Sequence, residues 1–460
     1  MHNSQKIEFK NRKILVVGLG VSGFNAARWL SKQGAMVTVS EERPETELNT
    51  TVCKDVRKLG ITLETGRHQK NTFLKSEMIV LSPGVPHNME PVRDAKKAGI
   101  QVTGELELSS RLIDTPMIAV TGTNGKSTVT ALLGALLKNA NLKVFVGGNI
   151  GTPLIAYIDE GEKADYVVVE VSSFQLDTIE TFCPFISILL NISPDHLDRY
   201  TSYEDYAQSK LRIFRNQRAG AHVILNDDDE ILSSVNPPSG VSVIRFGVKR
   251  KEGRHAYVQD NDIKASLTGR EHIHFSLTPF RLPGKHNLEN LLAVTLAGLI
   301  LGIEPTVIQQ TIGDFKGLPN RLEHVAEFSG VEFYNDSKAT NVDAAVRAIT
   351  SFDKPVILIA GGRHKGANYD RLVKAAKGGV RKAIFLGESK ELLAQSFEGA
   401  VPFLMAKDMD EAVSIAFSQA DRGDAVLLAP ACSSFDMFSD YAHRGVVFRA
   451  AVERLSHGKE

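Results

Sequence analysis

A run of small and polar residues around Lys126 has the residue types and spacing of a phosphate-binding site. The segment 118–128 reads Ile-Ala-Val-Thr-Gly-Thr-Asn-Gly-Lys-Ser-Thr, an apolar strand that enters a glycine-rich turn, and a helical pattern follows over 129–139. Backbone N–H groups of such a turn and of a helix start converge on phosphate oxygens. The lysine would neutralise the β- and γ-phosphates and the serine hydroxyl would reach Mg²⁺. The segment therefore predicts a nucleoside triphosphate site.

The spacing of this loop differs from that of the common phosphate loop. Gly122 lies three residues before Gly125, whereas the usual motif places its first glycine five residues before the Gly-Lys pair. The shorter loop favours a distinct lineage of ATPases. A tight strand-to-helix turn without a ligand is the alternative interpretation, but it leaves Lys126, Ser127 and Thr128 unexplained.

A second glycine-rich turn, Gly-x-Gly-x-x-Gly at 18–23, lies near the start of the chain. A short apolar strand over 13–18 precedes it, a helix is expected through Ser31, and Glu41 follows the next strand at 36–40. This pattern, with an acidic residue about 20 positions later, is typical of dinucleotide sites. It requires only a diphosphate on a helix N-terminus, so NAD, a nucleoside diphosphate and a diphosphate sugar all fit.

Three residues in the middle of the chain are candidates for metal binding. Glu170 ends the apolar strand 166–169, at the edge where α/β sheets place ligands, and it either binds Mg²⁺ or caps the following turn. His196 follows another strand and is either an unusual Mg²⁺ ligand or a hydrogen-bonded structural histidine. Lys210 lies on the next helix, where the pattern alone indicates a solvated lysine.

Further polar clusters follow strands or open helices toward the C-terminus. Asn287 opens a helix, either as its N-cap or as a side-chain amide that contacts a base. The run 335–341 follows a strand, and a turn explains only its first residues. Lys365 either binds a carboxylate or lies in a solvated basic turn. Ser434 either donates to a ligand or caps the next helix.

The length and the order of patterns predict an α/β protein of three domains. At 460 residues the chain exceeds the size of a single core. Strands and helices alternate, which predicts mostly parallel sheets covered by helices. We expect an N-terminal Rossmann-like domain over 1–106, a central ATPase domain over 107–317 and a C-terminal Rossmann-like domain over 318–460. Within the central domain, 241–282 is expected to form a small antiparallel appendage.

The composition excludes several classes of protein. Lysine plus arginine equals aspartate plus glutamate at 54 each, without blocks of like charge, so we expect no nucleic-acid or membrane partner. The three cysteines are scattered without metal spacing, which indicates a reducing compartment. The first residues lack a secretory signal, and the longest apolar run, 291–303, is too short to span a bilayer. These features favour a cytoplasmic protein.

Several motifs, in order along the chain, resemble those of the Mur ligases. They are Thr121–Thr128, Gly147–Gly151, Glu170–Leu176, Asp195–Asp198, Gly284–Asn287, Asn335–Asn341 and Ser433–Asp436. The resemblance implies an enzyme that uses ATP to phosphorylate the carboxylate of a UDP-linked acyl substrate, after which an amine attacks the acyl phosphate. The turn at 18–23, and the absence of the Asp-Asn-Pro-Arg motif of the diamino-acid-adding members, imply UDP-N-acetylmuramoyl-L-alanine and D-glutamate as substrates.

The resemblance also assigns roles to individual residues. For ATP it implies Gly122, Thr123, Asn124, Gly125, Lys126, Ser127, Thr128, Asn287, Asn290, Arg321 and Asp336. For the UDP substrate it implies Gly20, Val21, Ser22, Glu41, Arg43, Ser82 and Asn149. For D-glutamate it implies Thr340, Lys365, Ser434 and Tyr441. The catalytic residues that it implies are Lys126, His196, Lys210 and Lys338.

Two Mg²⁺ ions are implied in the same way. Ser127 and Glu170 would hold one ion, and His196 with Lys210 would serve the second. The family's lysine at the Lys210 position is carboxylated by CO₂, which converts a cation into an oxygen ligand suited to Mg²⁺. The partners implied are small molecules alone, and a monomer is expected.

Two other classes of protein would explain part of the sequence. An NAD-dependent oxidoreductase accounts for the turn at 18–23 but leaves the loop at Lys126 without a role. A nucleotide-sensing protein without ligase activity would keep Lys126 but would not need Lys210, Lys338 and Lys365 together. Their joint presence favours an enzyme.

Overall fold

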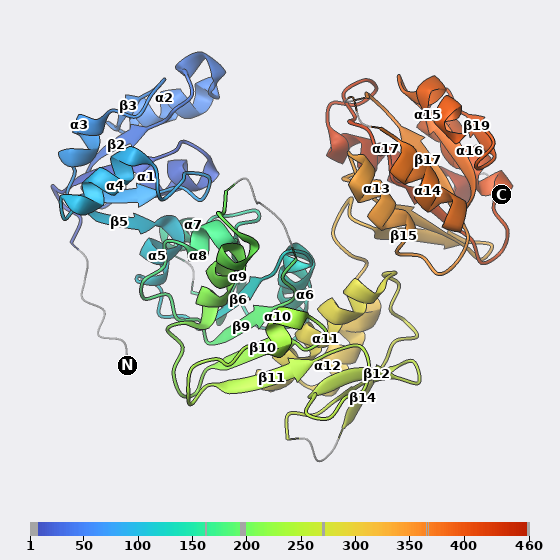
Figure 1. The fold of residues 1–460 in the computed structure, drawn as a ribbon, viewed down its shortest axis with the longest axis horizontal. Coiled ribbons are helices and arrows are strands. Elements are labelled where there is room, and N and C mark those ends of the chain that lie inside the picture. Colours follow the sequence, from blue (N-terminus) through green and yellow to red (C-terminus); the bar gives the residue numbers. More distant parts are fainter. Residues whose placement is uncertain are drawn as a thin grey trace. The chain divides into compact units, whose positions relative to one another are not determined.

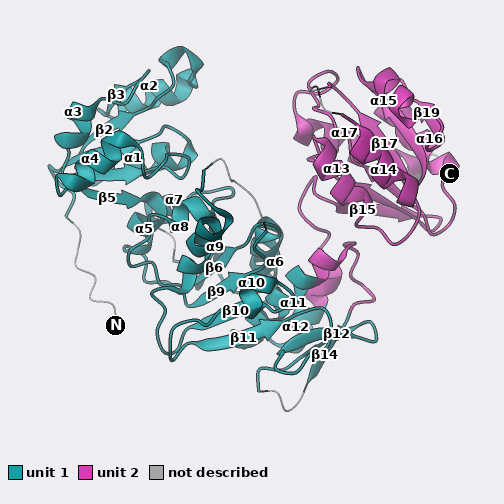
Figure 2. Cartoon of the chain, in the orientation of Figure 1, with its two compact units in different colours: residues 1–276, 289–309 teal, residues 277–288, 310–460 magenta. Residues whose placement is uncertain are grey.

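The computed structural model describes residues 8–161, 163–193, 199–268, 272–364, 366 and 368–457 and contains three α/β sheets (Figure 1). The chain forms two compact units (Figure 2). The first comprises Met1–Ser276 and Glu289–Gln309, and the second comprises Leu277–Leu288 and Gln310–Glu460. The predicted α/β class with three sheets is confirmed. The domain boundaries at 106 and 317 stay predictions.

The first sheet is parallel throughout, with the order β3-β2-β1-β4-β5. Its strands are β1 (Lys13–Val17), β2 (Met36–Ser40), β3 (Thr62–Glu64), β4 (Met78–Leu81) and β5 (Gln101–Gly104). Its helices are α1 (Val21–Lys32), α2 (Thr50–Lys58), α3 (Lys70–Leu74) and α4 (Glu90–Lys97), with a 3-10 turn at Glu45–Glu47. Because β2 and β4 flank β1 on opposite sides, the carboxyl end of β1 is the switch point where open α/β sheets bind ligands.

The second sheet has nine strands in the order β14-β13-β12-β11-β10-β9-β6-β8-β7. They are β6 (Met117–Thr121), β7 (Val144–Gly148), β8 (Tyr166–Glu170), β9 (Ile186–Leu189), β10 (His222–Asn226), β11 (Ser242–Phe246), β12 (Ala256–Gln259), β13 (Asp262–Ala265) and β14 (Ile273–Ser276). The prediction of a small antiparallel appendage over 241–282 is wrong in part. Strand β11 pairs parallel with β10, and only β12 to β14 pair antiparallel, as an extension of the same sheet.

The helices of this middle region precede and follow the strands of the second sheet. They are α5 (Glu105–Ser110), α6 (Lys126–Asn139), α7 (Leu154–Glu160), α8 (Ser173–Leu176), α9 (Tyr203–Leu211), α10 (Glu230–Ser233), α11 (Lys285–Ile300) and α12 (Pro305–Asp314), with a 3-10 turn at Arg212–Phe214. Among the described residues, every helix is too short or too polar to span a bilayer.

The third sheet lies in the second unit and has the order β15-β16-β20-β17-β18-β19. Its strands are β15 (Glu323–Phe328), β16 (Val331–Asn335), β17 (Val356–Gly361), β18 (Val380–Leu386), β19 (Phe403–Met405) and β20 (Ala425–Leu428). Only β15 is antiparallel to its neighbour. The helices are α13 (Val342–Ile349), α14 (Asp370–Gly379), α15 (Lys390–Phe397), α16 (Met409–Gln419) and α17 (Tyr441–His457).

Helix α6 shows how the sequence positions the phosphate loop, 122–125. Its residues Val129, Leu132, Leu133, Leu136 and Leu137 recur at helical spacing, and each is at most 2% exposed. Burial of a side chain of this size contributes roughly 1.5–3 kcal/mol. The buried face therefore fixes the helix against the sheet and holds its N-terminus at the end of β6.

Glu105 is a buried carboxyl group at the start of α5. It is 2% exposed, and its Oε1 atom accepts hydrogen bonds from the Ile155 N–H at 2.7 Å and from Ser109 Oγ at 3.2 Å. Its Oε2 atom is buried and has no hydrogen-bond partner among the described residues. Burial raises the pKa of Glu105 to about 7, although the two donors act in the opposite direction.

The Glu105→Gln variant is expected to change how stability depends on pH. Between about pH 4.5 and 7 the folded chain holds the Glu105 proton more tightly than the unfolded chain, so stability falls as pH rises through this window. Glutamine has no such proton, so the variant should gain about 1–3 kcal/mol over wild type above pH 7 and lose that advantage near pH 5. Urea unfolding across this range measures the difference.

Glu160→Gln, at the exposed end of α7, is the matched control and should follow the wild-type curve. Equal pH slopes for Glu105→Gln and wild type would contradict the expectation.

Candidate nucleotide and substrate site

The phosphate loop joins β6 to α6 through backbone conformations that favour glycine. Gly125 precedes the first residue of α6 and has a φ of 85°. A Cβ atom at this position would overlap Oδ1 of Asn290, which lies on α11. Both the conformation and the close approach therefore require glycine. No side chain caps this end of α6, which leaves its first N–H groups directed at the loop.

The segment that follows β9 fixes the phosphate loop on its other side. The Asn191 amide accepts from the Asn124 N–H at 2.8 Å and donates to the Asn124 carbonyl at 3.2 Å. Thr123 Oγ1 accepts from the Ser193 N–H at 3.0 Å. Sequence reasoning missed Asn191 and Ser193, although their place directly after a strand was a signal for a role at the loop.

Two lysines converge on this loop. Lys126 Nζ donates to the carbonyls of Gly122 and Thr123, each at 2.9 Å, and Lys210 Nζ donates to the same Gly122 carbonyl at 2.9 Å. Lys210 is 2% exposed, and its Nζ lies 4.6 Å from the centroid of the Tyr206 ring. The prediction of a solvated lysine at position 210, which rested on the pattern alone, is wrong, because Lys210 on α9 is buried and its ammonium group contacts the phosphate loop.

Oxygen-bearing side chains from three elements meet beside the first turn of α6. Ser127 Oγ donates to Glu170 Oε2 at 2.7 Å, and Asn149 Nδ2 donates to Glu170 Oε1 at 2.9 Å. Glu170 is 3% exposed at the end of β8. Ser172 itself caps α8 in a reciprocal capping box with Gln175, so the alternative in which Glu170 caps this turn is wrong. A hydroxyl and a carboxylate side by side suit Mg²⁺, which prefers oxygen ligands.

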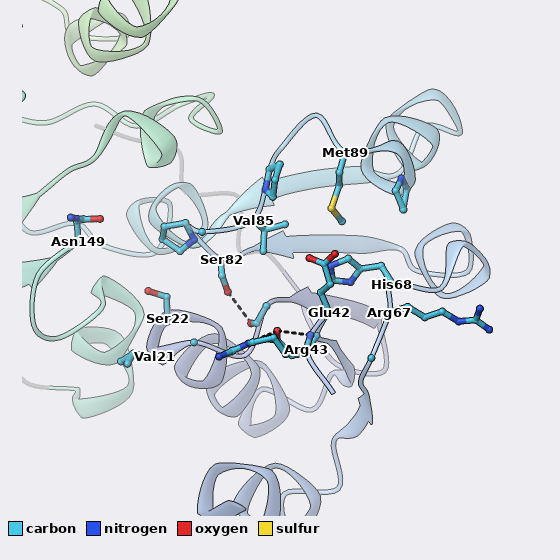
Figure 3. A pocket seen from close by; sticks show the side chains of 18 of the residues that line it. Val21, Ser22, Glu42, Arg43, Arg67, His68, Ser82, Val85, Met89 and Asn149 are labelled. Carbon is cyan, nitrogen blue, oxygen red and sulfur yellow. Dashed lines mark hydrogen bonds and ion pairs between the residues drawn. The ribbon is translucent and has the colours of Figure 1, made fainter. Parts of the chain in front are cut away.

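A pocket of about 890 Å³ lies at the switch point of the first sheet (Figure 3). It extends from the turn after β1 to Gly148, the last residue of β7, and to Asn149, which follows it. All seven residues predicted to bind a UDP substrate line it: Gly20, Val21, Ser22, Glu41, Arg43, Ser82 and Asn149. Asn149 also contacts Glu170, so it links the pocket to the cluster of oxygen ligands.

Glu41 shapes one wall of this pocket. Its Oε2 atom accepts from the Leu19 N–H at 2.8 Å, and its Oε1 atom accepts from the Arg43 N–H at 3.1 Å and from Arg43 Nε at 3.0 Å. Although burial disfavours its charge, the hydrogen bonds from Arg43 and Leu19 lower the pKa of Glu41 to about 2. The carboxylate stays ionised and fixes the turn that begins α1.

Gly23 explains the last glycine of the motif. A Cβ atom there would overlap the carbonyl oxygen of Gly18, to which Ser82 Oγ donates at 2.9 Å. The close packing of α1 on the end of β1 therefore requires glycine, and Ser82 joins β4 to the same turn.

In the second unit, predicted residues lie at the carboxyl ends of β16 and β20. Burial raises the pKa of Asp336 to about 7, although the Leu322 N–H, at 3.3 Å from Oδ1, and the charge of Arg321 act in the opposite direction. Lys338 is exposed, with its Nζ 5.4 Å from the centroid of the Tyr441 ring. Ser434 is 2% exposed, and its carbonyl accepts from the Phe438 N–H.

Arg444 joins the loops that carry Lys338 and Ser434, and sequence reasoning missed it. It is 2% exposed, donates through Nε to Ser337 Oγ at 3.0 Å and through Nη1 to the Cys432 carbonyl at 3.2 Å. Burial lowers the pKa of Arg444 to about 10, which leaves it charged at neutral pH. A basic residue on a terminal helix gave no signal of this burial.

Other predicted residues have less defined surroundings. His196 and Lys365 lie outside the described residues. Asn287 is the third residue of α11 rather than its N-cap, so that alternative is wrong, and its amide donates to the Pro283 carbonyl at 2.7 Å. Arg321 is exposed in the turn before β15, and Thr340 is half-buried. The ligand roles of all these residues stay predictions.

Comparison with known proteins gives the relationships of the whole chain. The Mur ligase MurD-like N-terminal domain matches residues 12–104, the Mur ligase middle domain matches 120–298, and the Mur ligase glutamate ligase domain matches 320–432. The chain belongs to the Mur ligase family. The match to the middle domain covers the phosphate loop, Lys210 and the pocket residues Gly148 and Asn149, and the match to the N-terminal domain covers the other residues that line the pocket.

Full-length relatives within the Mur ligase family share much of the sequence. A protein of Desulfosudis oleivorans named UDP-N-acetylmuramoylalanine--D-glutamate ligase is 44% identical over 98% of both chains. One of the same name from Geotalea daltonii is 42% identical over 98% of this chain and 99% of its own. Among solved structures, the UDP-N-acetylmuramate-alanine ligase MurC of Thermotoga maritima superposes with a TM-score of 0.56 at 20% identity, covering 98% of this chain and 100% of that one. This likeness confirms the fold.

Proposed function

We propose that this Mur ligase joins D-glutamate to UDP-N-acetylmuramoyl-L-alanine at the expense of ATP, during cytoplasmic synthesis of peptidoglycan precursors. The observation that carries the proposal is the name shared by the full-length relatives, which are more than 40% identical over nearly the whole chain. The phosphate loop and the pocket of the first sheet support it, because one chain provides separate places for two phosphorylated ligands. A small-molecule enzyme of this kind is expected to act as a monomer.

The chemistry explains why such an enzyme needs ATP. A carboxylate is a poor electrophile, so the L-alanine carboxylate first attacks the γ-phosphorus, and the bond to the departing ADP breaks. The D-glutamate amine then attacks the acyl carbon, the C–O bond to phosphate breaks, and the amine loses a proton. One ATP is therefore consumed, and one amide, one ADP and one phosphate are formed.

Residues around α6 would bind and activate the nucleotide. The N–H groups of Gly125, Lys126 and Ser127 would hold phosphate oxygens, and the Lys126 ammonium would stabilise the charge of the transferring phosphoryl group. Ser127 and Glu170 would hold one Mg²⁺, which neutralises charge on the β- and γ-phosphates when bound. Asn149 would orient the acyl substrate beside them, because it lies between the pocket and Glu170.

The second metal ion depends on a change in Lys210. As an ammonium group, Lys210 does not suit a cation, but addition of CO₂ to the neutral amine would form an N-carboxylate and release a proton. The buried side chain lies beside the phosphate loop, where an oxygen ligand is needed. His196 would be its partner at the same ion.

The substrate pocket suits a nucleoside diphosphate. The N-terminus of α1 at Val21 and Ser22 presents N–H groups to the diphosphate, and Arg43 adds a positive charge held in place by Glu41. Gly20 and Ser82 would complete this part of the site.

Residues from later parts of the chain would bind ATP and the incoming amino acid. Asn287, Asn290, Arg321 and Asp336 would contact the nucleotide, and Lys338 would act at the reaction centre. Thr340, Lys365, Ser434 and Tyr441 would bind D-glutamate.

Phosphate release from ATP tests the proposal. With UDP-N-acetylmuramoyl-L-alanine present, release should require D-glutamate and should stay at background with L-glutamate, L-lysine or meso-diaminopimelate. Release with one of the other amino acids would move the chain to another branch of the Mur ligases. Absence of release with all four would refute the ligase activity.

A further inference from the structure

A series of side-chain contacts begins at the wall of the pocket in the first sheet. Gly84 and Val85, after β4, line this pocket. Arg199, the first described residue after the gap at 194–198, donates through Nη1 to the Gly84 carbonyl at 3.1 Å. Its guanidinium lies 4.5 Å from the centroid of the Phe174 ring. Arg199 thus joins the pocket wall to helix α8 by a hydrogen bond and a cation–π contact.

The contacts continue from Phe174 to the phosphate loop through two tyrosines. Phe174 and Tyr200 are stacked, with centroids 5.9 Å apart and an interplanar angle of 12°. Tyr200 meets Tyr206 edge-on at 5.4 Å. The Tyr206 hydroxyl lies 3.1 Å from Oγ1 of Thr123, inside the phosphate loop. A continuous series of packed groups therefore leads from one predicted ligand site to the other.

Tyr200 at the centre of this series is held in one arrangement. Its hydroxyl donates to Asp177 Oδ2 at 2.8 Å and lies 3.3 Å from Ser209 Oγ. Burial raises the pKa of Tyr200, so it remains a neutral donor. His87, which follows the pocket wall in sequence, lies 4.0 Å from the same Asp177 carboxylate. The pocket wall is thus joined twice to the elements that support the phosphate loop.

Arg199 is the member of the series that a ligand would affect most. It is exposed, and a long exposed side chain loses rotamer freedom when its position is fixed. A ligand seated against Gly84 and Val85 would fix the carbonyl that Arg199 contacts. The Arg199 side chain would then already be ordered when the second ligand binds beside Thr123, so that second binding step would cost less conformational entropy.

We propose that Arg199 is a positioning residue that couples binding of the UDP-linked substrate in the pocket to binding of the nucleotide at the phosphate loop. The proposal rests on the proposed function, which supplies the two ligands. It predicts that each ligand raises the affinity of the other by the same factor, since such coupling is reciprocal.

Calorimetric titration of the full-length chain measures this coupling. UDP-N-acetylmuramoyl-L-alanine is titrated with and without a non-hydrolysable ATP analogue and Mg²⁺, in the absence of D-glutamate. We expect the wild-type affinity to rise by about fivefold or more when the nucleotide is present. For Arg199→Ala the ratio should fall to about one, while the affinity for the analogue alone stays within about twofold of wild type. Arg199→Lys should keep part of the ratio.

Two further variants separate the proposal from a general loss of structure. Phe174→Leu removes the ring beneath the guanidinium and should lower the ratio in the same way as Arg199→Ala. Arg218→Ala removes an exposed arginine from the segment before β10 and should keep the wild-type ratio.

The outcomes distinguish this inference from the proposed function. Equal ratios for wild type and Arg199→Ala, in a chain that releases phosphate with D-glutamate, would overturn the inference alone. The inference would also be overturned if Arg199→Ala no longer bound the nucleotide analogue in the absence of the UDP substrate, because that result would show a structural role for Arg199. Failure of the wild-type chain to bind the UDP substrate would overturn both.

Discussion

Lys126→Ala is expected to lower the rate of D-glutamate-dependent phosphate release by about 10³ or more. The Lys126 ammonium lies at the first turn of α6, where it contacts the carbonyls of the loop that would surround the phosphates. Loss of its charge leaves the developing negative charge of the phosphoryl group uncompensated in the transition state. Initial rates of phosphate release at saturating ATP measure the effect, and nucleotide affinity is measured separately by titration.

A matched control is available on the same helix. Lys138→Ala removes an exposed lysine in the last turn of α6, so it changes net charge equally and should keep the wild-type rate. Lys126→Arg should recover little activity, because the planar guanidinium does not reproduce the compact ammonium. A rate for Lys126→Ala within tenfold of wild type would rule out the proposed role.

The strands that position these residues were predictable because they are buried on both faces. Short apolar runs such as those of β1, β6 and β8 predict buried strands of a parallel sheet. The glycine-rich turns and helical patterns that follow them predict that each strand leads into a helix. The pocket followed from the same logic. The Gly-x-Gly-x-x-Gly turn places a helix N-terminus at the switch point, and the structure places all seven predicted residues around it.

The burial of charged side chains was not predictable in the same way. Lys210 lies on a short helix with polar neighbours, and only its contact with the Gly122 carbonyl, 88 positions away in sequence, reveals its place. Arg444 is buried by loops after β16 and β20, which sequence pattern cannot bring together. Such contacts depend on tertiary packing and leave no local periodicity.

The pairing of the strands at the β14 edge of the second sheet was also not predictable from the sequence. Strands β12, β13 and β14 are each only four residues long, so the sequence indicated β structure but not the partner of each strand. Strand β11 pairs parallel with β10, and this pairing makes β12 to β14 an extension of the second sheet. Pairing partners are set by the whole fold rather than by the strand itself.

Lys210→Ala is expected to abolish turnover, with rates falling to background. If the proposed N-carboxylate supplies an oxygen ligand beside the phosphate loop, alanine removes that ligand and also the hydrogen bond to the Gly122 carbonyl. The Thr123 side remains fixed by Tyr206 and Ser193, so the fold of the loop should survive. Circular dichroism and nucleotide titration check that it does.

Chemical rescue distinguishes a carboxylated lysine from an ordinary one. The shortened side chain leaves buried space beside the loop, into which acetate or formate can bring the missing carboxylate, whereas an amine would be needed to replace a simple ammonium group. Acetate should therefore restore part of the turnover of Lys210→Ala, and methylammonium should not. Gln208→Ala, exposed on the same helix, is the control and should keep wild-type turnover with or without acetate. Rescue by methylammonium alone would assign the role to the positive charge of Lys210, and full activity of the unrescued variant would remove Lys210 from the mechanism.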